Sequence, residues 1–323
     1  MIPLPDGRHA TRTVGRNAGL VFNKFVGPWP ADATEGLGDQ KATWLEHFRG
    51  RLEVSTAPAA RLKAMAENNG GKAEIYQSTG PFVTGMGLPN AVENGFLWHH
   101  TLGCPYLPGS SVKGMVRAWA EHWLEVNPKI IARLFGGDRI NPSAGSLIFY
   151  DALPVGAVTL YTEMITPHTG DWRISEKPQN SPPADWISPT PIPFLAVNAG
   201  AKFQFAISPR HTAAKGDVVT AFDWLKEALD WIGAGAKTAI GFGRFLSQED
   251  IQRNLWEEER FEGELAAAQR ETVKNAPPSV GDRAVHDEWG VVEVRMVNGD
   301  IAHVYSIDEG EDTSLPLAEL RKQ

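Results

Sequence analysis

The sequence has a single cysteine, Cys104, in 323 residues, and no apolar run as long as a membrane span. One cysteine excludes an intramolecular disulfide framework and a cysteine-based zinc site. A spanning helix needs roughly 18–20 consecutive apolar residues, which no segment provides. The N-terminus, Met-Ile-Pro-Leu-Pro-Asp, also lacks the pattern of a secretory signal peptide. We therefore expect a protein of the reducing cytoplasm with no membrane partner.

An excess of positive charge is also lacking. The formal net charge is −8, whereas a nucleic-acid-binding domain usually carries a basic surface. The acidity is confined to the end of the chain: residues 277–323 have 4 Lys and Arg against 10 Asp and Glu, and residues 249–276 have 4 against 8. Residues 1–248 keep 23 against 21, a net charge of +2. This first part therefore stays a candidate nucleic-acid surface.

Changes in composition divide the chain into three parts. Residues 1–248 mix helical and strand-like patterns, residues 249–276 form a charged linker helix, and prolines 277 and 278 mark a boundary. Residues 277–323 contain short strand-like runs broken by tight turns, typical of a small β-barrel of the SH3 or Tudor type.

The periodicity of apolar residues predicts the secondary structure of the first part. The predicted helices are at residues 41–51, 59–68, 110–123, 129–135 and 217–232. The predicted strands are at residues 19–26, 73–83, 146–153, 157–165, 194–197 and 202–208, and a turn at 154–156 joins the strands on either side of it.

The clearest helix follows Pro105–Gly109. Its apolar residues recur at helical spacing and form one stripe, made of Val112, Met115, Val116, Trp119, Ala120 and Trp123. We expect Ser110 or Ser111 to cap its N-terminus, where free backbone N–H groups and the helix dipole attract an anion. Lys113 and Arg117 lie four apart on one face and can reach a phosphate bound there. The alternative is a plain serine-capped helix with two solvated bases.

A glycine-rich segment, Gly233–Arg244, is the second candidate site. Its glycines and small neighbours allow another backbone to approach closely. Lys237 and Arg244 bracket it with positive charge, and Phe242 offers a ring for stacking. This combination fits contact with a sugar-phosphate backbone, with Gly241 and Gly243 leaving room for it. The alternative is an ordinary glycine-rich turn between a helix and a strand.

Two further segments carry side chains that suit RNA. His99 and His100 are adjacent, so on an extended chain they point to opposite faces, which argues against joint metal binding. A role for one of these histidines in RNA cleavage has no evident partner acid or base.

The proline-rich loop 166–193 holds Trp172 and Trp186 with basic side chains between them, a composition that suits the binding of unpaired nucleotides. The alternative is a flexible loop whose tryptophans pack on their own domain. The remaining helical tryptophans are expected in the core; they are Trp119, Trp123, Trp224 and Trp231.

Taken together, several segments resemble the RAMP superfamily of CRISPR proteins. The run Pro-Tyr-Leu-Pro-Gly-Ser-Ser-Val-Lys-Gly at 105–114 precedes a helix, and Gly-Ala-Lys-Thr-Ala-Ile-Gly-Phe-Gly-Arg-Phe at 235–245 resembles the glycine-rich loop of that superfamily. The segments at 87–103, 165–168, 182–186 and 191–197 are similar to the sixth-subunit family of the Cmr module, the type III-B CRISPR effector. The resemblance covers roughly residues 15–248.

The resemblance implies an α+β fold with an enlarged RRM-like (ferredoxin-like) core. It implies a non-catalytic subunit that holds guide RNA near its 3′ end, with target RNA and other Cmr-type RAMP subunits as partners and no metal or cofactor. The RNA-binding residues carried over are Ser110, Ser111, Lys113, Arg117, Lys237, Gly241, Gly243 and Arg244, together with His99 and Trp172. Two alternatives stay open: a standalone endoribonuclease that processes precursor guide RNA with His99 or His100, and an adaptor in which the acidic tail matters most.

The C-terminal part departs from the family pattern. Its net charge of −6 repels phosphate, so direct RNA contact is not expected there. Residues 280–294 are similar to SH3- or Tudor-like modules appended to some helicases. This similarity implies a protein-docking role or a solubilising appendage.

Overall fold

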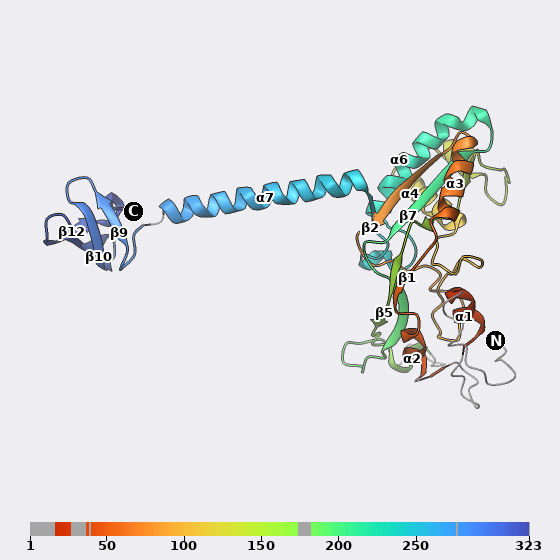
Figure 1. Cartoon of the computed structure of the whole chain (residues 1–323), viewed down its shortest axis with the longest axis horizontal. Helices are drawn as coiled ribbons and strands as arrows, with labels where there is room; N and C mark the ends of the chain where they lie inside the picture. The colour runs from red at the N-terminus through yellow and green to blue at the C-terminus, as the bar shows by residue number, and fades with distance from the viewer. Residues whose placement is uncertain (1–16, 27–36, 39, 174–181, 276, 323) are drawn as a thin grey trace. The chain divides into compact units, whose positions relative to one another are not determined.

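The computed structural model describes residues 17–26, 37–38, 40–173, 182–275 and 277–322. The chain divides into two compact units, Met1–Asp250 and Ile251–Gln323, and each is described by itself. Figure 1 shows the elements of both. Within the described residues, no helix is both long enough and apolar enough to cross a membrane.

The first unit is built on an antiparallel sheet in the order β3-β7-β2-β8. These strands are β2 (Lys72–Ser78), β3 (Leu147–Phe149), β7 (Lys202–Pro209) and β8 (Phe245–Ser247), and the short β4 (Leu153–Pro154) also pairs with β7. Two helices, α4 (Gly109–His122) and α6 (Lys215–Trp231), connect them. The chain thus runs β2–α4–β3–β7–α6–β8, and the other elements of this unit are insertions or extensions.

The alternation of residues along β7 explains why both faces of this sheet are covered. Phe203, Phe205 and Ile207 point into the main core, where they pack with residues of α4 and α6. Gln204 points the other way, and its side-chain amide donates to the carbonyl of Ala59 at 2.7 Å. Ala59 belongs to α3 (Ala57–Asn68), which therefore lies on the opposite face of the sheet.

A second antiparallel sheet joins β1 (Gly50–Leu52), β5 (Val158–Ile165) and β6 (Ile192–Val197). The strands expected at 146–153 and 157–165 therefore do not form a hairpin, because β3 and β4 belong to the first sheet. Hydrogen bonds to β7 on one side and to β6 on the other decide this division, and periodicity does not reveal it.

The strand expected at 19–26 is wrong, since these residues form helix α1 (Ala18–Lys24). The side chain of Asn17 caps this helix by accepting from the backbone N–H of Leu20 at 2.9 Å. Val21 and Phe22 are buried one turn after Ala18, so the spacing is helical. The helix expected at 41–51 is shorter than predicted: it ends as α2 (Gln40–Glu46), and the chain goes on into β1.

The other helices of this unit lie close to their predicted positions, including α5 (Pro128–Phe135). Two details differ. Pro108 is the N-cap residue of α4 and both serines lie within the helix, so the expected cap at Ser110 or Ser111 is wrong. Trp123 and Trp231 are 62% and 65% exposed, so the expectation that both lie in the core is wrong. Trp123 is the C-cap residue of α4, and Trp231 is the last residue of α6.

The second unit contains most of α7 (Gln248–Asn275) and a five-stranded antiparallel sheet in the order β12-β11-β10-β9-β13. Its strands are β9 (Arg283–His286), β10 (Gly290–Asn298), β11 (Ile301–Ser306), β12 (Asp312–Pro316) and β13 (Arg321–Lys322). It has a small core of its own, made of Ala284, Val292, Val294, Ala302, Val304, Leu315 and Leu320. The comparison with SH3 or Tudor modules stays a prediction.

Candidate nucleic-acid interface

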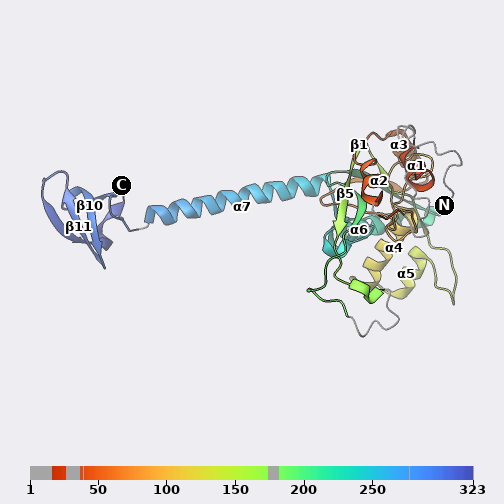
Figure 2. The same ribbon diagram turned by 90° about the horizontal axis from the view of Figure 1, so that it is seen from below.

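Three segments that the sequence singled out lie around one groove of about 600 Å³. The start of α4 contributes Ser111 and Met115, and the glycine-rich segment faces it from the end of α6. The remaining wall of the groove is formed by the connector after β2, through Thr84–Leu88 and Leu97. Figure 2 shows the side of the unit from which α4, α5 and α6 are seen. The lining residues are Thr84, Gly85, Met86, Gly87, Leu88, Leu97, Leu107, Ser111, Met115, Ile232, Gly233, Gly235, Ala236 and Thr238.

The glycine-rich segment is fixed by backbone hydrogen bonds to the strand-like segment opposite it. Gly243 donates to the carbonyl of Pro81 at 2.6 Å, and Ala236 donates to the carbonyl of Val83 at 2.8 Å. Gly243 has φ +71°, and a side chain there would overlap the carbonyl of Ala234. Gly243 is therefore buried and required by packing, whereas Gly241, with φ +92°, has open space around it. Of the two glycines predicted to face RNA, only Gly241 is exposed.

Lys237 stands at the tip of this segment in the left-handed region, with φ +60°. Its ammonium lies 5.5 Å from the centre of the Phe194 ring, a cation–π contact that holds it beside β6. Phe242 is buried, and its ring lies 6.4 Å from that of Phe194. The expectation that Phe242 offers a face for stacking is therefore wrong. Lys237 and Arg244 are both half-buried.

Arg244 is used to close the loop. Its guanidinium donates to the carbonyl of Asp230 at 3.2 Å and to that of Thr238 at 3.5 Å. Asp230 belongs to α6, before the glycine-rich segment, and Thr238 lies within that segment. Arg244 thus ties the end of α6 to the loop tip, in addition to carrying charge near the groove.

The N-terminus of α4 differs from the expectation of a free anion site. The backbone N–H of Gly109 donates to the carboxylate of Asp151 at 2.7 Å. A carboxylate already compensates the dipole at this helix end. Ser110 is exposed, and Ser111 lines the groove.

Lys113 and Arg117 lie on the other flank of α4 from Ser111 and Met115. Burial lowers the pKa of Lys113, and the neighbouring charges of Arg117 and Arg210 lower it further. Arg117 pairs with Glu121 at 2.8 Å. Arg210 follows β7, where its guanidinium donates to the carbonyl of Gly145 at 2.9 Å. No sequence pattern singled out Arg210, which lies directly after the end of β7, next to its pairing with β3.

His99 is half-buried, and its ring packs edge-on against Tyr106 with 5.3 Å between centres. Its Nδ1 lies 3.4 Å from the backbone N–H of Leu102, which donates to it. Burial lowers the pKa of His99, while the charge of Asp151 opposes this shift. His100 is exposed, so the two imidazoles stand in different surroundings. In the described parts of the chain, no three His, Cys, Asp or Glu side chains gather to hold a metal ion.

The tryptophans of the long loop lie at its surface. Trp172 is 39% exposed in a short 3-10 turn (Gly170–Arg173), and Trp186 is 88% exposed. His168 anchors this part of the loop through Nδ1, 2.6 Å from the carbonyl oxygen of Ile187. The side chain of Arg173 and the whole of Lys177 lie outside the described residues. The loop presents exposed rings, and its interleaved bases are not described.

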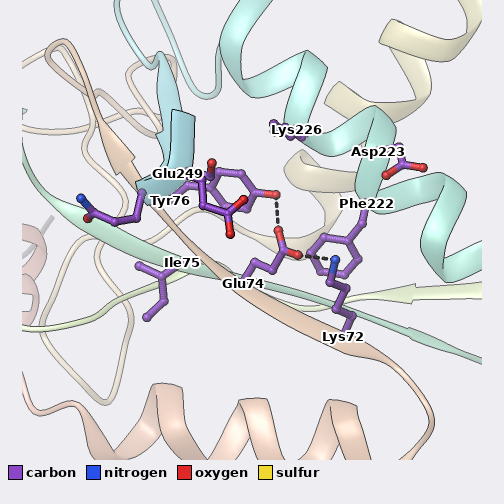
Figure 3. Close-up of a pocket in the computed structure, with 10 residues that line it drawn as sticks. Lys72, Glu74, Ile75, Tyr76, Phe222, Asp223, Lys226 and Glu249 are labelled. Atoms are coloured by element: carbon purple, nitrogen blue, oxygen red, sulfur yellow. Dashed lines mark hydrogen bonds and ion pairs between the residues drawn. The ribbon is translucent and has the colours of Figure 1, made fainter. Parts of the chain in front are cut away.

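A second cavity, of about 450 Å³, lies between β2 and α6 (Figure 3). The hydroxyl of Tyr76 donates to Glu74 at 2.6 Å, and Lys72 pairs with the same carboxylate. The ammonium of Lys72 lies 5.2 Å from the centre of the Phe222 ring. Burial and the contact with Glu74 raise the pKa of Tyr76. Tyr76, Glu74 and Lys72 therefore satisfy one another at the floor of this cavity, while Asp223 and Glu249 also line it.

The chain is 24% identical over 228 aligned positions to the CRISPR system Cmr subunit Cmr6 of Pyrococcus furiosus (strain ATCC 43587 / DSM 3638 / JCM 8422 / Vc1). That alignment covers 53% of this chain and 66% of the relative, just under two thirds of its length. A chain in a cryo-EM structure of the type III-B Cmr-beta bound to cognate target RNA superposes with a TM-score of 0.52. Its sequence identity is 19%, with 66% of this chain and 72% of that chain covered, so this likeness concerns the fold.

The family model of the RAMP superfamily matches residues 76–246. This range begins within β2 and ends within β8, so it contains the groove, α4, α6 and the glycine-rich segment. The match covers more than half of the chain. The protein therefore belongs to the RAMP superfamily.

Proposed function

We propose that the protein is a non-catalytic, RNA-binding subunit of a type III-B CRISPR (Cmr) effector complex, acting in antiviral defence. Guide RNA, target RNA and other Cmr-type RAMP subunits are its proposed partners, and the site lies near the 3′ end of the guide. The observation that carries this proposal is the groove between the start of α4 and the glycine-rich segment. The similarity to Cmr6 supports the choice of complex.

The groove suits a single strand better than a duplex or a free phosphate. Its lining side chains are neutral, with small residues and glycines on both rims. Lys237 stands at the loop tip beside it and can attract a backbone phosphate. An unpaired strand offers sugar and base surface to the groove while its phosphates remain near this cation.

The sheet itself does not offer the usual RRM binding mode. RRM modules stack bases on aromatic side chains of the open sheet face. Here α3 covers that face, and the β7 residues pointing to it are Gln204, Ala206 and Ser208. We propose that the β2–α4–β3–β7–α6–β8 path is an RRM-like core whose RNA contacts have moved to the groove at its edge.

The proposal of a non-catalytic role is supported by the surroundings of His99. RNA cleavage by proton transfer needs a base and an acid placed around one ribose. His99 is half-buried and accepts from the backbone of its own turn through Nδ1. Asp151 is near enough to affect its pKa, but this carboxylate is engaged by Gly109. Neither group is presented to a strand in the groove.

The first experiment is co-expression with the other Cmr subunits and a guide RNA. We expect the tagged chain to co-purify with both. Binding of the isolated chain to labelled single-stranded RNA should weaken as salt rises. Lys237→Glu should weaken binding and lower the salt dependence by about one counterion, whereas Lys63→Glu on α3 should change little. Failure to co-purify with either subunits or guide would overturn the proposal.

The second experiment separates this role from the endoribonuclease alternative. The purified chain is incubated with repeat RNA in the absence of metal. We expect no cleavage. Cleavage that disappears in His99→Ala but persists in His211→Ala would replace the proposed role by that of a processing nuclease.

A further inference from the structure

Helix α7 carries exposed apolar side chains that the RNA-binding role does not use. Leu255 is 48% exposed, Phe261 65% and Leu265 50%. All lie outside the residues matched by the family model, which ends at residue 246. Figure 1 shows α7 as one continuous helix. In proteins, helices are stabilised mainly by packing an apolar face, so these side chains mark a surface that another molecule can cover.

The apolar side chains lie on one side of the helix. At about 100° per residue, Ile251, Leu255, Phe261 and Leu265 fall within an arc of about 120°. This set is called the α7 stripe below. Trp256 and Arg260 lie on the opposite side, where the guanidinium stacks 5.1 Å from the centre of the Trp256 ring. The stripe and this cation–π pair are therefore separate surfaces.

Two acidic side chains stand inside the stripe. Glu258 and Glu262 fall between the apolar residues on the same arc and are exposed. The ion pair on this stretch, Arg260–Glu264 at 3.6 Å, uses other residues. Neither glutamate has an ion-pair partner within the described residues. A partner covering the stripe must place positive charge against both.

A second copy of the chain does not meet this requirement. Pairing two stripes in parallel and in register, or antiparallel and centred on residue 260, brings Glu258 and Glu262 of one helix against the same acidic residues of the other. The arginines of this stretch, Arg253 and Arg260, point away from the stripe and cannot compensate. Residues 249–276 carry 4 Lys and Arg against 8 Asp and Glu, so self-association is disfavoured overall.

We propose that the α7 stripe is a docking surface for a basic amphipathic helix of another protein. Leucine-like side chains of that helix pack on Phe261 and Leu265, and its Lys or Arg residues pair with Glu258 and Glu262. Aromatic and large apolar side chains surrounded by complementary charge dominate the affinity of such interfaces. This surface is independent of the groove and of the RNA-binding proposal.

The test uses the full chain and a labelled peptide helix with Leu at the a and d positions and Lys at e and g over about four heptads. Fluorescence anisotropy should show binding that a scrambled peptide and a Glu-for-Lys peptide both lack. Phe261→Ala and Leu265→Ala should each weaken it about tenfold or more, and Glu258→Gln should weaken it less. Trp256→Ala, on the opposite side, is the matched control. Alanine favours helix, so circular dichroism should show that α7 is intact in every variant.

Three results would overturn the proposal. Peptide binding that is the same in Phe261→Ala shows non-specific attraction to acidic charge. A dimer in sedimentation experiments that Phe261→Ala dissociates assigns the stripe to a second copy. Slow hydrogen exchange across α7 in a monomer, abolished by Leu265→Ala, shows that the chain covers the stripe itself.

Discussion

The backbone N–H of Gly109 donates to the carboxylate of Asp151 at 2.7 Å, across 42 positions of sequence. The start of α4 is the most evident anion site in the sequence, yet in the folded chain a carboxylate already occupies part of it. The strand in the groove is therefore expected to rely on Lys237 and the glycine-rich segment more than on this helix terminus.

Replacing Asp151 tests this division of roles. Asp151→Asn keeps an oxygen that can accept from Gly109 but removes the charge that compensates the helix dipole. We expect the free energy of unfolding to fall by about 0.5–1 kcal/mol, measured by denaturant titration. RNA affinity should stay within about twofold at fixed salt, because the strand does not use the helix end. A large gain in affinity with a steeper salt dependence would instead place a phosphate at Gly109.

Gly241 and Gly243 of the glycine-rich segment make a matched pair, because the first is exposed and the second is buried. Gly243→Ala combines a left-handed backbone with overlap against the Ala234 carbonyl. We expect a loss of about 2–4 kcal/mol in the free energy of unfolding. Gly241→Ala faces open space and should lose about 1 kcal/mol from its backbone conformation alone. Similar losses in both, measured by urea unfolding, would contradict the packing role assigned to Gly243.

The cluster around Lys113 predicts a change in binding without a change in stability. Lys113→Glu replaces a charge that Arg117 and Arg210 repel with one that they attract. We expect the free energy of unfolding to change by no more than about 0.5 kcal/mol, while RNA affinity falls. Arg210→Glu should act in the same direction. A large drop in melting temperature for Lys113→Glu would contradict its placement off the core.

The surroundings of His99 predict a pH dependence of stability. Burial lowers its pKa below the ordinary value of about 6.5. Between its lowered pKa in the folded chain and about 6.5, His99 binds more protons when the chain is unfolded. The contribution of His99 to stability is therefore full above about pH 6.5 and is lost as the pH falls from there through the lower folded-state pKa. Melting temperatures measured from pH 5 to 7.5 should rise with pH, and less steeply in His99→Gln. His211→Gln controls for loss of an exposed imidazole; equal slopes for His99→Gln and the parent would reject this role.

Deleting residues 277–323 tests whether the tail is needed for assembly. The tail has its own core, and its net charge is −6. We therefore expect the truncated chain to fold, bind RNA and co-purify with the Cmr subunits. Calorimetry and pull-down with guide RNA measure both properties. Loss of assembly with an unchanged melting temperature would support the adaptor alternative in which the acidic tail matters most.

Local patterns predicted the helices well where apolar spacing was regular. The helix at 217–232 and the stop at Gly136 after α5 need only residues that are neighbours in sequence. The segment at 19–26 failed because a short run containing Val and Phe fits both a strand and one buried helical turn. Asn17, whose side chain caps that turn, is a signal that could have resolved it.

The candidate site was only partly open to prediction. The sequence singled out the start of α4, the glycine-rich segment and the connector after β2, and the structure brings all three around one groove. The sequence did not predict that Ser111 and Lys113 lie on different flanks of α4. The sequence also did not predict the burial of Phe242 and Gly243. Their contacts with Phe194 and Ala234 form only when the tertiary structure packs.

The sequence by itself determined which segments carry chemistry, where the acidic extension begins and which helices form, because composition, charge and periodicity are local properties. The tertiary structure alone decided that Asp151 occupies the start of α4, that Arg210 joins Lys113 and that α3 covers the sheet. Each of these depends on strand pairing between residues far apart in the chain. A register of hydrogen bonds across a sheet leaves no mark in the spacing of any one segment.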